Sequence, residues 1–218
     1  MIDILCTIII FSSMLMLFKY FGKYQVNNLQ AIIVNYFTAG SLALFIANVN
    51  GIPIVFQRII LSPYIVPSLI IGLLFIITFN LLAYGTQKIG IAISTVANKM
   101  SMIIPIIIGI YLFKEALGIF KLIGTILAIS AIYMTSTKGG KLSFDKKYLH
   151  IILLIFFGQG IADGTLNWAQ KFTITTVNTP IFFACTFLSA GTLGSLFLLY
   201  ELIVKKIRLQ PKSILWGI

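Results

Sequence analysis

The sequence predicts an all-α polytopic membrane protein built from two inverted five-helix repeats. Three observations lead to this prediction: the apolar composition, the alternation of long apolar runs with short basic connectors, and a correspondence between the two ends of the chain. Of the 218 residues, 59% are hydrophobic and only 10% are charged. The mean hydropathy of +1.05 lies far above the range of soluble proteins.

Seven apolar runs are expected to form spanning helices, because each approaches the roughly 20 residues that cross a bilayer. They cover residues 2–18, 29–47, 64–84, 89–115, 122–134, 148–168 and 180–203. The first run has no basic segment before it and no small-residue cleavage site, which favours a retained helix over a signal peptide. The intervals 48–63 and 85–88 are expected to be a loop and a turn, 135–147 a polar linker, and 213–218 the start of an eighth helix.

The end of the chain echoes its beginning at an offset near 151 or 152 residues. The corresponding positions are Lys19 with Lys171, Asn28 with Pro180, Ala39 with Ala190, and Gly40 with Gly191. Inverted transporter repeats show themselves through weak internal correspondence of this kind. We therefore expect a first repeat over residues 1–147 and an incomplete second repeat over 148–218, in a ten-helix protein of roughly 290 residues. A complete protein of about seven helices is the alternative.

Charge and composition exclude several classes of function. The formal charge of +11 comes mainly from basic residues in the connectors, where membrane proteins keep them, and this argues against nucleic-acid binding. Cys6 and Cys185 lie inside apolar runs and are interpreted as small hydrophobic side chains. His150 is the only histidine, and no catalytic constellation or nucleotide-binding motif occurs. We expect no metal, no cofactor and no enzymatic activity.

The run 89–115 carries polar residues near its middle. Asn98, Ser101 and Pro105 lie on one helical face, and Lys99 lies on the adjoining stripe. A cation at the centre of a span costs several kcal/mol unless something solvates it, so this face is expected to meet protein or water. Asn98 and Ser101 either line a cavity or bond to neighbouring helices. Pro105 removes one backbone hydrogen bond and is either a hinge or a static kink.

A second polar stripe lies on the run 148–168, where Gln159, Asp163 and Asn167 are spaced by four. A side chain of opposite charge is the least costly partner for a buried charge. We therefore expect Lys99 and Asp163, one from each repeat, to face one central cavity. They either bind a polar or zwitterionic solute, with Asp163 as a proton acceptor, or form a salt bridge that locks the repeats together.

The centre of the first repeat carries a recognisable pattern. Ala-Tyr-Gly-Thr-Gln-Lys-Ile-Gly at 83–90 leads into the helix with Pro105, followed by Tyr-Leu-Phe-Lys-Glu at 111–115 and by Gly124. This pattern resembles the EamA-like branch of the drug/metabolite transporter superfamily. The resemblance implies ten helices in two inverted repeats around a central cavity, with both termini in the cytoplasm. The positive-inside rule, applied to the connectors, predicts the reverse orientation, so both orientations stay open.

The expected function is therefore that of a secondary transporter in the bacterial inner membrane. It would move a small organic metabolite, such as an amino acid, by alternating access. Lys99 suggests a solute that bears a carboxylate. The alternatives are a membrane-embedded lipid-handling protein or enzyme that uses the same cavity, and a scaffold without transport activity. The substrate, the direction of transport, the coupling ion and the oligomeric state stay open.

Overall fold

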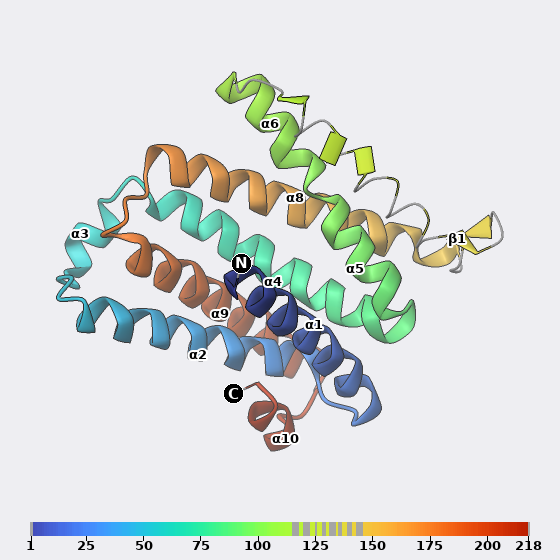
Figure 1. Ribbon diagram of the computed structural model, residues 1–218. Helices are drawn as coiled ribbons and strands as arrows, with labels where there is room; N and C mark the ends of the chain where they lie inside the picture. Colours follow the sequence, from blue (N-terminus) through green and yellow to red (C-terminus); the bar gives the residue numbers. More distant parts are fainter. Residues whose placement is uncertain are drawn as a thin grey trace. The chain divides into compact units, whose positions relative to one another are not determined.

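The computed structural model describes residues 2–114 and 146–217, and between them only residues 118–119, 123–124, 126–127, 130, 134, 137–138 and 141–142. Helices make up nearly all of the two long segments (Figure 1). Within the described residues, six spans are long and apolar enough to cross a membrane. The predicted all-α membrane fold is thereby confirmed.

The spans are formed by seven helices, two of which follow one another within a single span. They are α1 (Ile2–Lys23), α2 (Asn28–Val49), α4 (Ile65–Lys88), α5 (Ile91–Met100) with α6 (Ile103–Phe113), α8 (Leu149–Phe172) and α9 (Thr179–Val204). The short elements are α3 (Phe56–Ile60), the 3-10 turn Lys146–Tyr148, and α10 (Pro211–Leu215). The strands β1 (Thr137–Lys138) and β2 (Lys141–Leu142) pair antiparallel inside the predicted linker.

Several predicted boundaries were wrong. The expected turn at 85–88 is the last turn of α4, the expected loop at 48–63 contains α3, and α1 continues past residue 18 to Lys23. Helices extend beyond their apolar runs because a terminal lysine can reach water while its stem stays on apolar surface, and because its charge complements the helix C-terminus. The expected helix at 122–134 falls largely outside the described residues, as does Glu115.

By their contacts the residues fall into two compact units. Unit 1 comprises Met1–Gln25 and Asn80–Gly160, and unit 2 comprises Val26–Phe79 and Ile161–Ile218. Each unit contains residues from both predicted repeats. The predicted repeat boundary at residue 147 therefore does not coincide with a boundary between the two units.

Unit 2 is organised by the packing of α2 along α9 (Figure 1). A Cβ added at Gly40 of α2 would come within 2.8 Å of the Leu188 side chain of α9, and one added at Gly191 of α9 would come within 3.2 Å of the Phe37 ring of α2. Gly40 and Gly191 are 151 residues apart, and so are Phe37 and Leu188. The contact is therefore reciprocal, which is the pattern of a two-fold symmetric interface.

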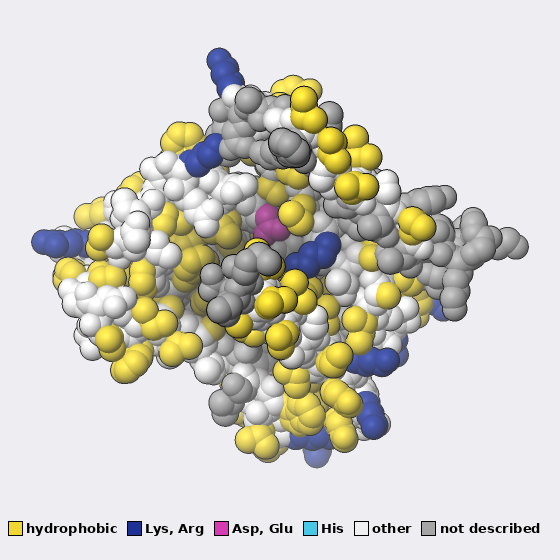
Figure 2. Space-filling model, in the orientation of Figure 1, with side chains coloured by type: hydrophobic (Ala, Val, Ile, Leu, Met, Phe, Trp, Pro, Cys, Tyr) yellow, Lys and Arg dark blue, Asp and Glu magenta, His cyan; other side chains and the backbone are white. Residues whose placement is uncertain are grey.

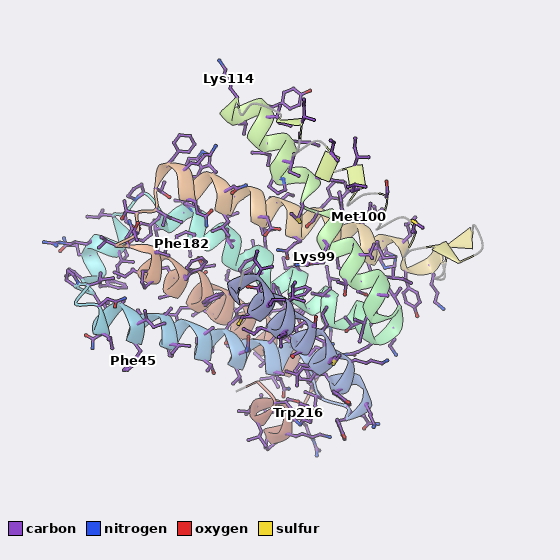
Figure 3. The ribbon with its side chains drawn as sticks, viewed as in Figure 1. Phe45, Lys99, Met100, Lys114, Phe182 and Trp216 are labelled. Atoms are coloured by element: carbon purple, nitrogen blue, oxygen red, sulfur yellow. The ribbon has the colours of Figure 1, made fainter. Side chains whose placement is uncertain are left out.

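Aromatic rings continue this contact through the interior of unit 2. Tyr36 stacks on Phe187, with ring centroids 6.1 Å apart, and meets Phe79 edge-on at 6.2 Å. Tyr36 and Phe187 are again 151 residues apart, so this stack joins corresponding positions of the two predicted repeats. Nearer the start of α9, Phe182, labelled in Figure 3, is fully buried in a cluster with Tyr64 and Ile71.

The segment after α9 is attached to the start of α2 by hydrogen bonds. The backbone N–H of Gln210 donates to Gln30 Oε1 at 2.9 Å, and Gln30 Nε2 donates to the Arg208 carbonyl at 3.1 Å. The backbone N–H of Asn27 donates to Ser213 Oγ at 2.9 Å. The buried Gln30 amide thus gives hydrogen-bond partners to the Gln210 N–H and the Arg208 carbonyl, which lie in the non-helical segment between α9 and α10.

The remaining surface of the spans is apolar. Ile8, Ile9 and Ile10 of α1 are 56%, 64% and 68% exposed, and apolar side chains spread over the face shown in Figure 2. Such a surface is typical of helices that meet lipid.

Gly72→Ala is expected to destabilise unit 2. The added methyl group would overlap Ser189 Oγ and would lie 2.8 Å from the Thr186 carbonyl. Overpacking costs about 1–3 kcal/mol, and the better helix propensity of Ala returns up to about 1 kcal/mol. We expect the melting temperature of the detergent-solubilised protein to fall by several degrees. Val66→Ile, which adds one methyl group at a position 59% exposed on the same helix, is the control. An unchanged melting temperature in Gly72→Ala would contradict the packing of α4 on α9.

Tyr36→Phe is expected to raise the melting temperature, or at least not to lower it. The Tyr36 hydroxyl is buried and has no hydrogen-bond partner among the described residues. An unsatisfied buried polar group costs about 1–3 kcal/mol, and the substitution removes that cost while keeping the ring stack. Phe187→Ala, which removes the ring that stacks on Tyr36, is the contrasting variant and should lower the melting temperature. A clear loss of stability in Tyr36→Phe would mean that the hydroxyl has a partner in the folded protein.

Candidate functional site

The span over residues 91–112 is interrupted at Ser101 and Met102, where α5 ends and α6 begins. The sequence predicted one span with a kink caused by Pro105; in the structure the break lies one turn before the proline and divides the span into two helices. Pro105 has no N–H to donate to the Ser101 carbonyl, four residues before it. That carbonyl instead accepts from the Ile104 N–H at 2.9 Å, and Met102 donates to the Lys99 carbonyl at 3.3 Å. The helix tightens one turn before the proline because backbone groups within a bilayer need partners.

Asn98 and Ser101 lie inside unit 1, with exposed fractions of 6% and 0%. The Ser101 hydroxyl donates to the Asn98 carbonyl at 2.5 Å. This bond gives a partner to a carbonyl in the last turn of α5, so the Ser101 hydroxyl stabilises the backbone at the interruption. Ser94, one turn earlier, is also buried, and its hydroxyl has no hydrogen-bond partner among the described residues.

Lys99 is exposed on α5 (Figure 3). Its ammonium lies over the ring of Phe11 on α1, with Nζ 3.9 Å from the ring centroid. An ammonium over an aromatic face is stabilised by the ring quadrupole, most strongly where water is excluded. Phe11 thus gives partial solvation to a charge in the middle of a span. The sequence indicated the need for such a group but did not identify it.

The polar stripe of α8 approaches the interrupted span from another side. A Cβ at Gly160 would overlap the side chain of Ile104, at the start of α6. Gln159, next to Gly160 on α8, is half-buried in unit 1. The structure therefore packs α8 against the start of α6, directly after the interruption. Gln159, a predicted site residue, lies next to this contact.

Asp163 and Asn167 follow on the same face of α8 and belong to unit 2. Asp163 is half-buried and Asn167 is exposed. The expected proximity of Lys99 and Asp163 would join residues of the two units, and it stays a prediction. Among the described residues, no group of three His, Cys, Asp or Glu side chains gathers to hold a metal ion.

The sequence reasoning missed a pocket of about 730 Å³ within unit 1, at the end of α1 and the turn from α4 to α5. Gly90 makes that turn with a φ of 123°, a conformation that L side chains rarely adopt. Lys19, Lys23 and Lys88 line the pocket, although the sequence had placed them in connectors. The spacing of Lys19 and Lys23, one helical turn apart, was the available signal for a basic end of α1.

The sequence was also compared with known proteins and protein families. A protein of Haemophilus influenzae (strain ATCC 51907 / DSM 11121 / KW20 / Rd), described as an uncharacterized protein, is 26% identical over 197 residues. The alignment covers 87% of this chain and 64% of that protein, so the chain spans less than two thirds of its relative's length. No solved structure matches. Residues 1–137 match the EamA-like transporter family. With this match over more than half of its length, the chain belongs to the EamA-like transporter family of the drug/metabolite transporter superfamily.

Proposed function

We propose that the protein is a secondary transporter of the bacterial inner membrane that moves a small carboxylate-bearing metabolite, such as an amino acid, by alternating access. Its family consists of transporters rather than enzymes, and its spans are those of an integral membrane protein. The observation that carries the proposal is the interruption of the α5–α6 span beside Lys99. Discontinuous helices near the bilayer midplane are the usual substrate sites of secondary transporters.

Two sources of positive potential meet at the interruption. Lys99 supplies a full charge in the last turn of α5, and the start of α6 presents the positive end of a second helix dipole. The Met102 cap of α6 makes no side-chain hydrogen bond. An anionic group such as a carboxylate matches the charge of Lys99 and the positive end of α6. Asn98 and Gln159 are proposed to contribute polar contacts, and Asp163 and Asn167 to complete the site.

The reciprocal contact of α2 with α9 supports the alternating-access part of the proposal. The three pairs of positions that meet there are Gly40 with Leu188, Phe37 with Gly191, and Tyr36 with Phe187. An offset of 151 residues relates Gly40 to Gly191, Phe37 to Leu188 and Tyr36 to Phe187, as an internal two-fold axis between repeats requires. Inverted repeats related in this way rock against one another around a fixed site. We propose that this contact is the pivot.

Lys99→Gln is expected to lower the ratio kcat/KM for solute uptake by about tenfold to a hundredfold. This range corresponds to the loss of one charge-assisted interaction with the carboxylate, worth about 1.5–3 kcal/mol. The measurement is uptake of a pool of labelled amino acids and organic acids by the full-length protein in proteoliposomes. Arg58→Gln, which removes an exposed cation of α3 outside the spans, is the matched control. Wild-type uptake by a well-folded Lys99→Gln variant would contradict the proposed role of Lys99.

Asp163→Asn in the same assay separates solute binding from proton coupling. If Asp163 carries the proton, the variant keeps solute exchange between the two sides but loses the acceleration by an imposed pH gradient. A pH-gradient response equal to that of the wild type would remove Asp163 from the coupling mechanism.

Pro105→Ala is expected to slow transport without weakening solute binding. The substitution restores an N–H donor for the Ser101 carbonyl and favours a continuous helix, so the melting temperature is expected to stay equal or rise. If Pro105 is the hinge, the maximal uptake rate falls severalfold while the apparent affinity is kept. Pro180→Ala is the matched control, because Pro180 lies in the first turn of α9, where a missing donor is harmless. Equal rates in both variants would make Pro105 a static kink.

A further inference from the structure

The basic pocket of unit 1 is formed by two helix ends and one helix start. Its lining residues are Met16, Lys19, Tyr20, Gly22, Lys23, Gln87, Lys88 and Ile91. α1 ends at Lys23, α4 ends at Lys88, and α5 begins at Ile91. None of these described lining residues is acidic, so three ammonium groups share one concave space without a carboxylate in its wall.

Close packing holds the floor of the pocket in place. A Cβ added at Gly22 would lie 2.9 Å from Cγ of Gln87, and Gln87 Nε2 donates to the Phe18 carbonyl at 3.0 Å. The end of α4 is thereby fixed against α1. The three lysines that line the pocket are solvent-exposed, and Lys23 Nζ lies 5.6 Å from the ring centroid of Tyr24 and 6.0 Å from that of Tyr20. The basic pocket is thus a defined recess and more than a row of surface charges.

We propose that the basic pocket binds the phosphate headgroup of an anionic phospholipid. The charges fit a phosphodiester, and their position at the ends of two spans places them at the level of lipid headgroups. Tyr20 and Tyr24, 47% and 43% exposed, are typical of side chains in the aromatic belt at that level. Basic side chains gather over the end of α1 in Figure 2.

The surface that leads away from the pocket selects a lipid over a soluble anion. On α1, Met16 lies one turn before Tyr20 and two turns before Lys23, and Ile9 lies two turns before Met16 on the same helical face. Ile9 is 64% exposed and Met16 is 58% exposed. Only 17% of the α1 span is buried, the smallest share among the six described spans. An acyl chain can therefore follow this apolar face while its phosphate stays among the lysines.

The basic pocket shares only Ile91, the first residue of α5, with the interrupted α5–α6 span and lies at the opposite end of α5 from Ser101 and Met102, so it does not depend on the proposed substrate. A headgroup bound there would join the end of α1 to the turn between α4 and α5. The lipid would act as a structural ligand that stabilises unit 1 at the membrane surface.

The test is native mass spectrometry of the full-length protein in detergent, titrated with phosphatidylglycerol or with phosphatidylcholine of the same acyl chains. The wild type is expected to bind phosphatidylglycerol at least tenfold more tightly. The triple variant K19Q/K23Q/K88Q is expected to lose that preference, because each lysine near an anionic headgroup contributes about fivefold. K206Q/R208Q/K212Q, which removes three positive charges from the segment before and within α10, should keep it.

Three results would overturn the proposal. The first is an equal loss of preference in both triple variants, which would indicate diffuse surface charge. The second is an unchanged preference in K19Q/K23Q/K88Q. The third is displacement of phosphatidylglycerol by millimolar inorganic phosphate, which would indicate a site for a soluble anion. If the triple variant does not fold, K88Q alone should weaken phosphatidylglycerol binding about fivefold, since Lys88 is the exposed last residue of α4. An unchanged affinity in K88Q would also count against the pocket.

Discussion

The close contact of α2 with α9 is the constraint on which unit 2 depends. In a bilayer, helices gain no hydrophobic free energy from meeting one another, so they associate through dense packing and interhelical hydrogen bonds. Gly40 and Gly191 allow the Leu188 and Phe37 side chains to enter the opposite helix surface. Larger residues at the two glycines would separate the helices and leave the Tyr36 and Phe187 rings apart.

A second constraint acts along the interrupted span. Each backbone polar group in hydrocarbon needs a partner, and a proline removes one donor from the ladder. The chain meets this requirement locally, with the tightened turn at Ser101 and with the hydroxyl of Ser101 on the Asn98 carbonyl. The Ser101 side chain of this span therefore supplies a hydrogen bond to the backbone at the interruption. Lys99 provides the positive charge beside it.

The sequence predicted the spans well because hydropathy over 20 residues is a strong signal and needs no tertiary information. The bodies of α2, α8 and α9 agree with the predicted runs to within a few residues. Boundaries were less predictable. The last turns of α1 and α4 contain lysines, and a lysine in the sequence is equally compatible with the end of a helix and with a connector. The interruption at Ser101 was placed only indirectly, through Pro105 four residues later.

The family resemblance, the polar stripe of α8 and the residues Asn98, Lys99 and Ser101 were all available from the sequence by itself. These features follow from residue type and helical spacing, which are local properties. The tertiary structure decided which side chains meet: Phe11 beneath the Lys99 ammonium, Ile104 against Gly160, and Lys19, Lys23 and Lys88 around one pocket. The reason is physical, because such contacts join residues far apart in the chain, and they arise only when the small side chains allow particular helices to approach.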